Sequence, residues 1–422
     1  MYQIADAKIL FGAGRRLRSR GEGAVRVDRN VVLLGLTSLF TDISSEMVAT
    51  ILPLYLVYTR GLSLLEFGVV DGLYLGAAAL VRIASGIVGD RRQRHKQVAA
   101  FGYGLSAACK LAFLAVSSVW TGFSAIVVVD RTGKGIRTAP RDALISLSSS
   151  REELATAFGV HRALDTTGAM IGPLLAFGLL ALTPLSFNTV FVVSFCVALV
   201  GLAILLLFVE NRTSVESDRD GPATSLRAVA GLLAAPRLRV LVAIAAVLGL
   251  VTISDGFLYL GLQRHLHIDA RFFPLLYVGT ACSYALLAAP LGRVADRVGR
   301  GRIFIGGYAL LLLVYTSLLL PAIGLPVLAL YLLLFGAYYA ATDGVLAALA
   351  SAVLPPSLRG SGLALIGTAT NLSRLLSSVL FGALWTAFGM HVAVVVFTGA
   401  LFAAGVASAA GLLRTTGRAV RA

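Results

Sequence analysis

Long apolar runs separated by short polar stretches dominate the sequence. Each run approaches the about 20 residues that a helix needs to cross the hydrocarbon core of a bilayer. The pattern predicts an all-α integral membrane protein with twelve spans, and the fourth and fifth are included despite their charges because the neighbouring spans require them. We place the spans at residues 31–57, 66–88, 97–117, 121–142, 155–180, 187–209, 238–261, 273–294, 302–320, 326–350, 359–384 and 391–413.

The first six spans and the last six resemble each other in sequence. Asp42 follows a Leu-Gly-Leu sequence in the first span, and Asp255 follows the same sequence in the seventh. Asp142 and Asp343 form a second matching pair, which we expect at the cytoplasmic rim of each half. A repeat of this length in a membrane chain predicts two pseudo-symmetric six-helix bundles around a shared site, the architecture of alternating-access transporters.

The repeat also sets the expected division of the chain. A polar stretch rich in Asp, Arg, Ser and Gly separates the two halves and is the one clear linker. We therefore expect an N-terminal arm, a first bundle, a linker, a second bundle and a tail, at residues 1–30, 31–209, 210–237, 238–413 and 414–422.

Composition excludes a soluble protein. With 58% hydrophobic and 14% charged residues among 422, the chain could not cover its own surface with polar groups. The net charge of +15 would suggest nucleic acid, but the basic residues crowd alternate connections, at residues 15–29, 91–96, 212–239, 293–302 and 414–421. That distribution follows the positive-inside rule, so we expect a multi-pass protein of the cell (inner) membrane with both termini in the cytoplasm and no nucleic-acid partner.

Ionisable residues inside the spans are the candidates for chemistry. Asp42 lies eleven residues into the first span, roughly 17 Å deep at a rise of about 1.5 Å per residue, and Glu46 follows on the same helical face. A charge at such depth costs at least about 2.5–3.5 kcal/mol, so these groups must pair or face water. The candidate cavity and proton-coupling residues are Asp42, Glu46, Arg82, Asp130, Arg131, Lys134, Arg137, Arg162, Asp165 and Asp255.

Two interpretations of these charges stay open. They could be interhelical ion pairs that hold the first bundle together, or they could line a water-filled transport cavity. In the second case, a carboxylate beside an arginine stays ionised and takes up a proton when the arginine moves away. Asp42 and Glu46 are the candidate protonatable groups. Because the second half carries far fewer such charges, we expect it to contribute a more apolar substrate surface.

Three sequence motifs support a family resemblance. A Gly-x-x-x-Asp-Arg-x-Gly-Arg loop comprises Gly292, Asp296, Arg297, Gly299 and Arg300, and its first-half copy comprises Gly86, Asp90, Arg91 and Arg94, with Gln93 in place of the second glycine. A fourth-span Arg-x-x-Gln-Gly motif comprises Arg131, Lys134 and Gly135, with Lys in place of Gln. A fifth-span motif comprises Gly159, Gly168, Gly172 and Pro173, with Ala176-Phe177 in place of the closing Gly-Gly.

With these motifs, the chain after residue 30 resembles the major facilitator superfamily (MFS) of secondary transporters. The resemblance implies that the loop motifs act as an inter-bundle latch that favours the outward-facing state. It implies a role in proton coupling for Arg131. It associates the fifth-span motif with antiporters, and thereby with efflux.

We therefore expect a proton-coupled exporter of a small organic compound that works as a monomer and uses the proton gradient rather than a cofactor. An uptake symporter or facilitator for a sugar, organic acid or phosphorylated metabolite is the alternative in the same class. A membrane enzyme lacks the expected motifs: His-Glu-x-x-His, Gly-x-Ser-x-Gly and a Cys/His metal-ligand cluster are absent from the sequence. A transport-inactive receptor would have little need for so many charges at membrane depth.

Overall fold

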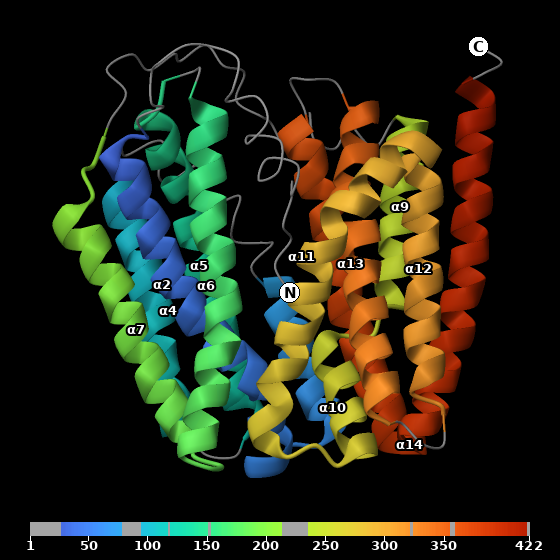
Figure 1. Cartoon of the computed structure of the whole chain (residues 1–422), viewed down its shortest axis with the longest axis horizontal. Coiled ribbons are helices and arrows are strands. Elements are labelled where there is room, and N and C mark those ends of the chain that lie inside the picture. Colours follow the sequence, from blue (N-terminus) through green and yellow to red (C-terminus); the bar gives the residue numbers. More distant parts are fainter. Residues whose placement is uncertain are drawn as a thin grey trace.

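The computed structural model describes residues 27–77, 94–116, 119–150, 153–212, 235–320, 324–354 and 359–419. Within these ranges the chain is helical and contains no strand. The helices form two groups that stand side by side, one from each half of the sequence (Figure 1). The predicted all-α, two-bundle arrangement fits this structure.

The first bundle holds the helices of the first half. They are α2 (Arg29–Leu54) with its π-helical continuation η1 (Tyr55–Thr59), a helix over residues 64–77, α4 (His95–Ala115), α5 (Trp120–Leu147), α6 (Leu154–Leu182) and α7 (Phe187–Phe208). Each of the first six predicted spans coincides with one of these helices, although the later part of the second span, from residue 78, lies outside the described residues.

The second bundle holds the helices of the second half. They are α9 (Pro236–Leu250), α10 (Asp255–Leu266), η2 (Ala270–Phe272), α11 (Phe273–Val298), α12 (Arg300–Ser317), α13 (Leu325–Val353) and α14 (Arg359–Ala419). Gly389, with φ of +83°, divides α14 into the two last predicted spans, because this backbone conformation favours glycine.

The seventh span differs from the prediction of one continuous helix. α9 ends at Leu250, and α10 begins at Asp255 after a short non-helical stretch. Ser254 caps α10 by accepting a hydrogen bond from the Phe257 amide, a role that favours a helix start at this position. The corresponding residues of the first span, around Asp42, stay helical. The break therefore places a helix start within the second bundle.

Length and apolar composition support a membrane location. In the described part of the chain, eight helices are long and apolar enough to cross a bilayer. This count takes α14 once although it contains two predicted spans. It omits α5, which carries many charges, and it also omits α12 and the helix over residues 64–77.

Glycines allow the helices of the first bundle to pack closely. A Cβ atom on Gly172 of α6 would lie 2.6 Å from the Ile43 carbonyl oxygen of α2. A Cβ atom on Gly133 of α5 would lie 2.8 Å from the Gly102 carbonyl oxygen of α4. Such close approach is typical of membrane helices, where packing rather than the hydrophobic effect drives association.

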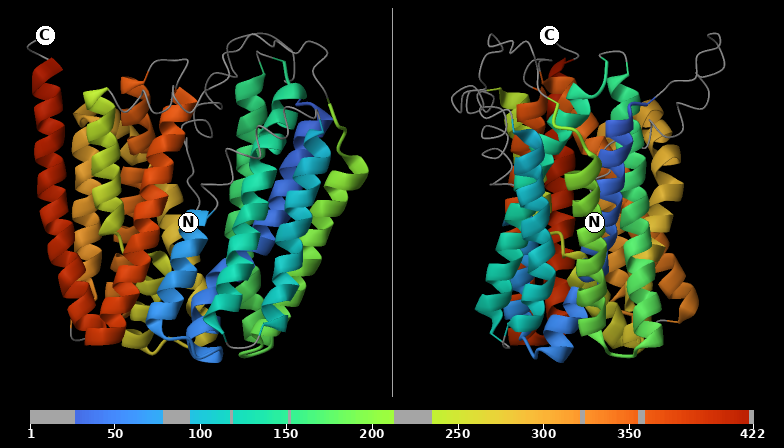
Figure 2. Two further views of the ribbon diagram at one scale, coloured as in Figure 1. Left: turned by 180° about the vertical axis from the view of Figure 1, so that it is seen from behind. Right: turned by 90° about the vertical axis from the view of Figure 1, so that its left-hand side faces the viewer.

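The two bundles meet at one end of the molecule, which we call the closed end. It comprises η1, the start of the helix over residues 64–77, the end of α10, and η2. There the Tyr58 hydroxyl donates to Gln263 at 2.8 Å, and the rings of Phe177 and Phe272 stack at 5.8 Å. At the opposite end, the open end, where α5 and α13 finish, the ribbons of the bundles stand apart (Figure 2).

Candidate functional site

A cavity of about 680 Å³ lies between the two bundles. At one limit it is lined by Phe67 and Asp71, close to the closed end. At the other limit it is lined by Asp142 and Phe158, near the ends of α5 and α6 at the open end. This volume and its position between two bundles suit a small-molecule site.

Most of the charged residues singled out from the sequence line this cavity. They are Asp42, Glu46, Arg131, Lys134, Arg137, Arg162, Asp165 and Asp255. Asp130 is buried and is not among the lining residues, while Arg82 lies outside the described residues. Gly159 and Pro173 of the fifth-span motif also face the cavity.

Two of these acids form a pair. Asp42 on α2 and Asp165 on α6 are joined by a side-chain hydrogen bond, and only 3% and 5% of their surfaces are exposed. An ionised carboxylate is an acceptor only, so a hydrogen bond between two carboxyl groups requires a proton on one of them. The pair can therefore hold a proton in the wall of the cavity.

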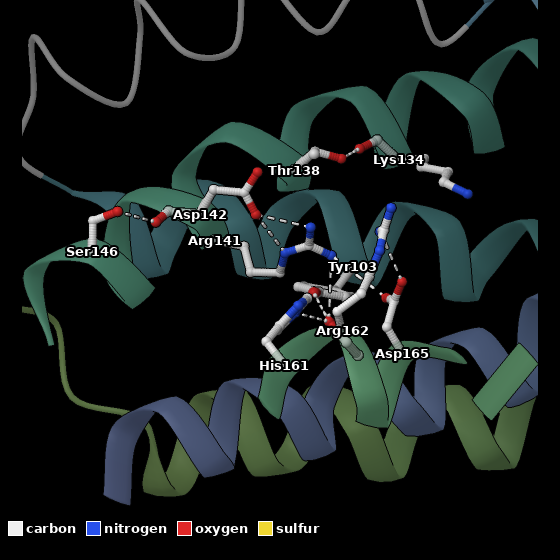
Figure 3. A network of polar contacts seen from close by, with 10 residues as sticks. Tyr103, Lys134, Thr138, Arg141, Asp142, Ser146, His161, Arg162 and Asp165 are labelled. Carbon is white, nitrogen blue, oxygen red and sulfur yellow. Dashed lines mark hydrogen bonds and ion pairs between the residues drawn. The ribbon is translucent and has the colours of Figure 1, made fainter. Parts of the chain in front are cut away.

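Asp165 is also the meeting point of two arginines. Arg162 Nη1 lies 3.3 Å from Asp165 Oδ2, and Arg141 Nη1 lies 4.0 Å from Asp165 Oδ1 (Figure 3). Arg141 in turn binds Asp142 at 2.9 Å. These contacts favour negative charge on Asp165.

A polar cluster continues from this point towards the first helix. His161 Nε2 lies 2.9 Å from the Ser38 hydroxyl, which is 3.4 Å from both the Tyr103 hydroxyl and Arg141 Nη1. Figure 3 shows Tyr103, Arg141 and His161 converging from α4, α5 and α6. The network ties Arg141 to three helices besides its own.

Arg131 has a partner that its sequence position did not indicate. Its Nη2 lies 2.6 Å from Asp130, the preceding residue, which also binds Lys110 Nζ of α4 at 2.8 Å. The Arg131 guanidinium stacks 3.8 Å from the ring centre of Tyr74. Lys110 could have been found from the sequence, because it is a charge inside the third predicted span.

The second bundle lines the cavity with three charged residues, Asp255, Asp343 and Arg374. The Tyr339 hydroxyl donates to Asp255, and Arg374 Nη2 lies 3.2 Å from the Tyr338 hydroxyl. Asp343, which we expected at the cytoplasmic rim, lines the cavity and interacts electrostatically with Arg374. The first bundle nevertheless supplies most of the charged residues that line the cavity.

Asp71 is a further cavity residue that sequence reasoning missed. It lies in the helix over residues 64–77 and accepts a hydrogen bond from Ser378 of α14 at 2.6 Å. The signal was available, since Asp71 is an acid near the start of the second predicted span.

The second-half loop motif forms a tight turn. Gly299 has φ of +111°, a conformation that favours glycine, and it separates α11 from α12. Arg300 reaches back to Asp296 at 3.1 Å and to the Ala348 carbonyl oxygen of α13 at 3.4 Å. In the first-half copy, Gly86, Asp90 and Arg91 lie outside the described residues, and Arg94 directly precedes α4.

Comparison with known proteins agrees with this architecture. Residues 34–261 and 240–421 match the family described as the Major Facilitator Superfamily. The chain is 31% identical over 382 residues to an uncharacterised MFS-type transporter of Methanocaldococcus jannaschii, covering 88% of this chain and 92% of that protein.

Solved transporter structures show the same fold. A variant of the nucleoside transporter NupG superposes with a TM-score of 0.76 at 14% identity, covering 91% of this chain and 100% of that one. A variant of the peptide transporter POT superposes with a TM-score of 0.74 at 14% identity, covering 93% and 96%. With a two-bundle helical fold, a charged cavity between the bundles and these matches, the chain belongs to the major facilitator superfamily and is a multi-pass membrane transporter rather than an enzyme.

Proposed function

We propose that the protein is a proton-coupled secondary transporter that exports a small organic compound by alternating access. The observation that carries the proposal is the hydrogen bond between Asp42 and Asp165 in the wall of the inter-bundle cavity. A paired carboxyl site that needs one proton, and that faces a substrate-sized cavity, has the means to link proton binding to substrate binding.

Coupling follows from the change in charge when the pair of Asp42 and Asp165 gains or loses its proton. With a proton on the pair, Asp42 donates to Asp165, and Arg141 and Arg162 stabilise the charge that remains. When that proton leaves, two carboxylates face each other at short range and repel. The cavity then has a different charge and shape in the two protonation states, so it binds substrate differently in each. A difference in affinity between states is what a coupled transporter requires.

The fifth-helix motif supports export. Gly168 and Gly172 lie three and seven residues after Asp165, so all three face the same side of α6. Both glycines pack against the α2 backbone at Leu39 and Ile43, next to Asp42. The glycines of this motif therefore fix how closely Asp42 and Asp165 approach each other. The resemblance associates the motif with antiporters, so a link between the motif and the proton site is expected if proton entry drives efflux.

Topology completes the proposal. The positive-inside distribution supports a cytoplasmic linker at residues 210–237 and cytoplasmic termini. In that orientation the open end faces the cytoplasm, and the cavity loads substrate from there. We propose the cell (inner) membrane as the site of action and the monomer as the working unit.

Transport in proteoliposomes tests the coupling. A panel of dyes, drugs and metabolites is first screened for lower accumulation in cells that express the protein than in cells with an empty vector. The compound found is then followed in proteoliposomes with an imposed pH gradient. We expect gradient-driven flux in the wild type and in the control variant Glu210→Gln, whose side chain is 74% exposed and does not line the cavity. We expect this flux to be lost in Asp42→Asn and Asp165→Asn.

Each part of the proposal has its own contrary result. Full gradient-driven flux in both Asp42→Asn and Asp165→Asn would show that the pair does not couple transport. Higher rather than lower accumulation in the expressing cells would overturn export.

One observation favours a second candidate, uptake or facilitated transport of an anionic metabolite. Arg131, Lys134 and Arg137 recur every three residues along α5, and all three line the cavity. Such a row suits a carboxylate or a phosphate group. Accumulation of labelled organic acids or sugar phosphates by expressing cells, without dependence on the pH gradient, would select this candidate.

A further inference from the structure

Asp71 joins the two bundles through hydrogen bonds to two serines. Its Oδ2 accepts from the Ser378 hydroxyl of α14 at 2.6 Å, and its carboxylate also accepts from the side chain of Ser254. Asp71 belongs to the first bundle, whereas Ser254 and Ser378 belong to the second. We call these three residues the Asp71 bridge.

Glycine packing holds the bridge together. A Cβ atom on Gly68 would lie 2.6 Å from the Ser378 carbonyl oxygen, and one on Gly72 would lie 2.7 Å from the Leu375 carbonyl oxygen. Gly256, two residues after Ser254, is so near that a Cβ atom there would lie 3.2 Å from Asp71 Oδ1. Because side chains are missing at these points, the two bundles approach within reach of a direct hydrogen bond.

The bridge stands between the cavity and the closed end. Asp71 and Ser254 line the cavity, while Ser378 is fully buried in the helix behind it. Beyond the bridge, towards the closed end, Tyr58 joins Gln263 at 2.8 Å and Arg264 at 3.0 Å. These outer contacts are exposed to solvent, whereas the hydrogen bond between Asp71 and Ser378 is partly buried, so competing water weakens it less.

We propose that the Asp71 bridge is the gate of the closed end, which must break each time the cavity opens there. For the bundles to separate at this end, Asp71 must leave both serine hydroxyls at once. The bridge therefore favours the conformation described here over one that is open at the closed end. This gate acts whatever the transported compound is and whether or not protons drive transport.

Distances across the closed end test the gate directly. Leu182 at the end of α6 and Leu325 at the start of α13 are 81% and 80% exposed, so cysteines there accept spin labels without loss of packing. The background carries alanine at Cys109, Cys196 and Cys282. Double electron–electron resonance in nanodiscs then gives the ratio of the long to the short inter-label distance, without any substrate.

We expect Ser378→Ala to raise this ratio by about tenfold, as befits the loss of a hydrogen bond to a carboxylate. Ser377→Ala is the matched control, because Ser377 is the adjacent residue, is equally buried, and donates to the Thr252 carbonyl oxygen within its own bundle. The control should leave the distance distribution unchanged.

A second variant keeps the proposal testable if Ser378→Ala does not fold. Ser254→Ala removes the other donor from a different helix and should shift the ratio in the same direction. An unchanged ratio in folded Ser378→Ala and Ser254→Ala would overturn the gate. So would an equal shift in Ser377→Ala, because the effect would then be a general loss of packing.

Discussion

Gly168 of α6 lies against Leu39 of α2 so closely that a Cβ atom on the glycine would stand 2.4 Å from the leucine carbonyl oxygen. That atom is backbone and part of a helix, so it cannot turn aside as a flexible side chain would. The contact lies one turn from the pair formed by Asp42 and Asp165. Helix packing and the candidate proton site are therefore parts of one interface.

Gly168→Ala should separate α6 from α2 and weaken the Asp42–Asp165 hydrogen bond. We expect lower thermal stability in detergent, by an amount equivalent to about 1–3 kcal/mol for an overpacked core position. Gly178→Ala on the same helix is the control, because a Cβ atom there meets nothing within 4 Å. Equal melting temperatures for the two variants would contradict the close contact.

The motifs and the periodic apolar pattern made the architecture predictable. Helix positions follow from apolar length, and the charged groups that line the cavity could be named because ionisable residues are rare in membrane spans. Pairing was harder to anticipate. Asp42 bonds to another acid and Arg131 to its own neighbour, since partner choice depends on helix rotation and tilt, which the apolar pattern leaves open. Asp71 could have been noticed as an acid in the second predicted span, but its hydrogen-bond partner comes from the other bundle and could not be named.

The buried triad of Lys110, Asp130 and Arg131 predicts an unequal response to mutation. Asp130→Asn leaves two cations without their shared anion, and removing one partner of a buried ion pair costs about 3–5 kcal/mol. Lys110→Met leaves Asp130 paired with Arg131, so we expect a smaller loss. Thermal melting of purified protein measures both.

A double variant of this triad separates the effect of an unpaired buried charge from the effect of altered side-chain packing. Lys110→Met combined with Asp130→Asn removes one positive and one negative charge, and should melt at a higher temperature than Asp130→Asn alone. If the stability loss of the double variant equals the sum of the losses of Lys110→Met and Asp130→Asn, the three residues are not energetically coupled.

Gly299 predicts a local backbone effect in the second loop motif. Its φ of +111° is strained for any residue with a side chain, so Gly299→Ala should destabilise the turn by about 1 kcal/mol or more. Gly306→Ala in α12, where a Cβ atom meets nothing within 4 Å, should be neutral or slightly stabilising because alanine favours a helix. Melting temperatures in detergent compare the two, and a more stable Gly299→Ala would show that the turn tolerates a side chain.

If the carboxyl pair carries the coupling proton, Asp42→Asn should separate exchange from gradient-driven transport. Asparagine keeps the size of the side chain and can donate its amide N–H to Asp165, so the pair remains bonded but no longer takes up or releases a proton. With the compound found in the transport screen, proteoliposomes of this variant should still exchange internal for external compound at a rate within a few-fold of wild type. They should lose accumulation against a concentration gradient when only a pH gradient is imposed. Loss of exchange as well would assign Asp42 to substrate binding, and retention of both activities would place the coupling proton on another group.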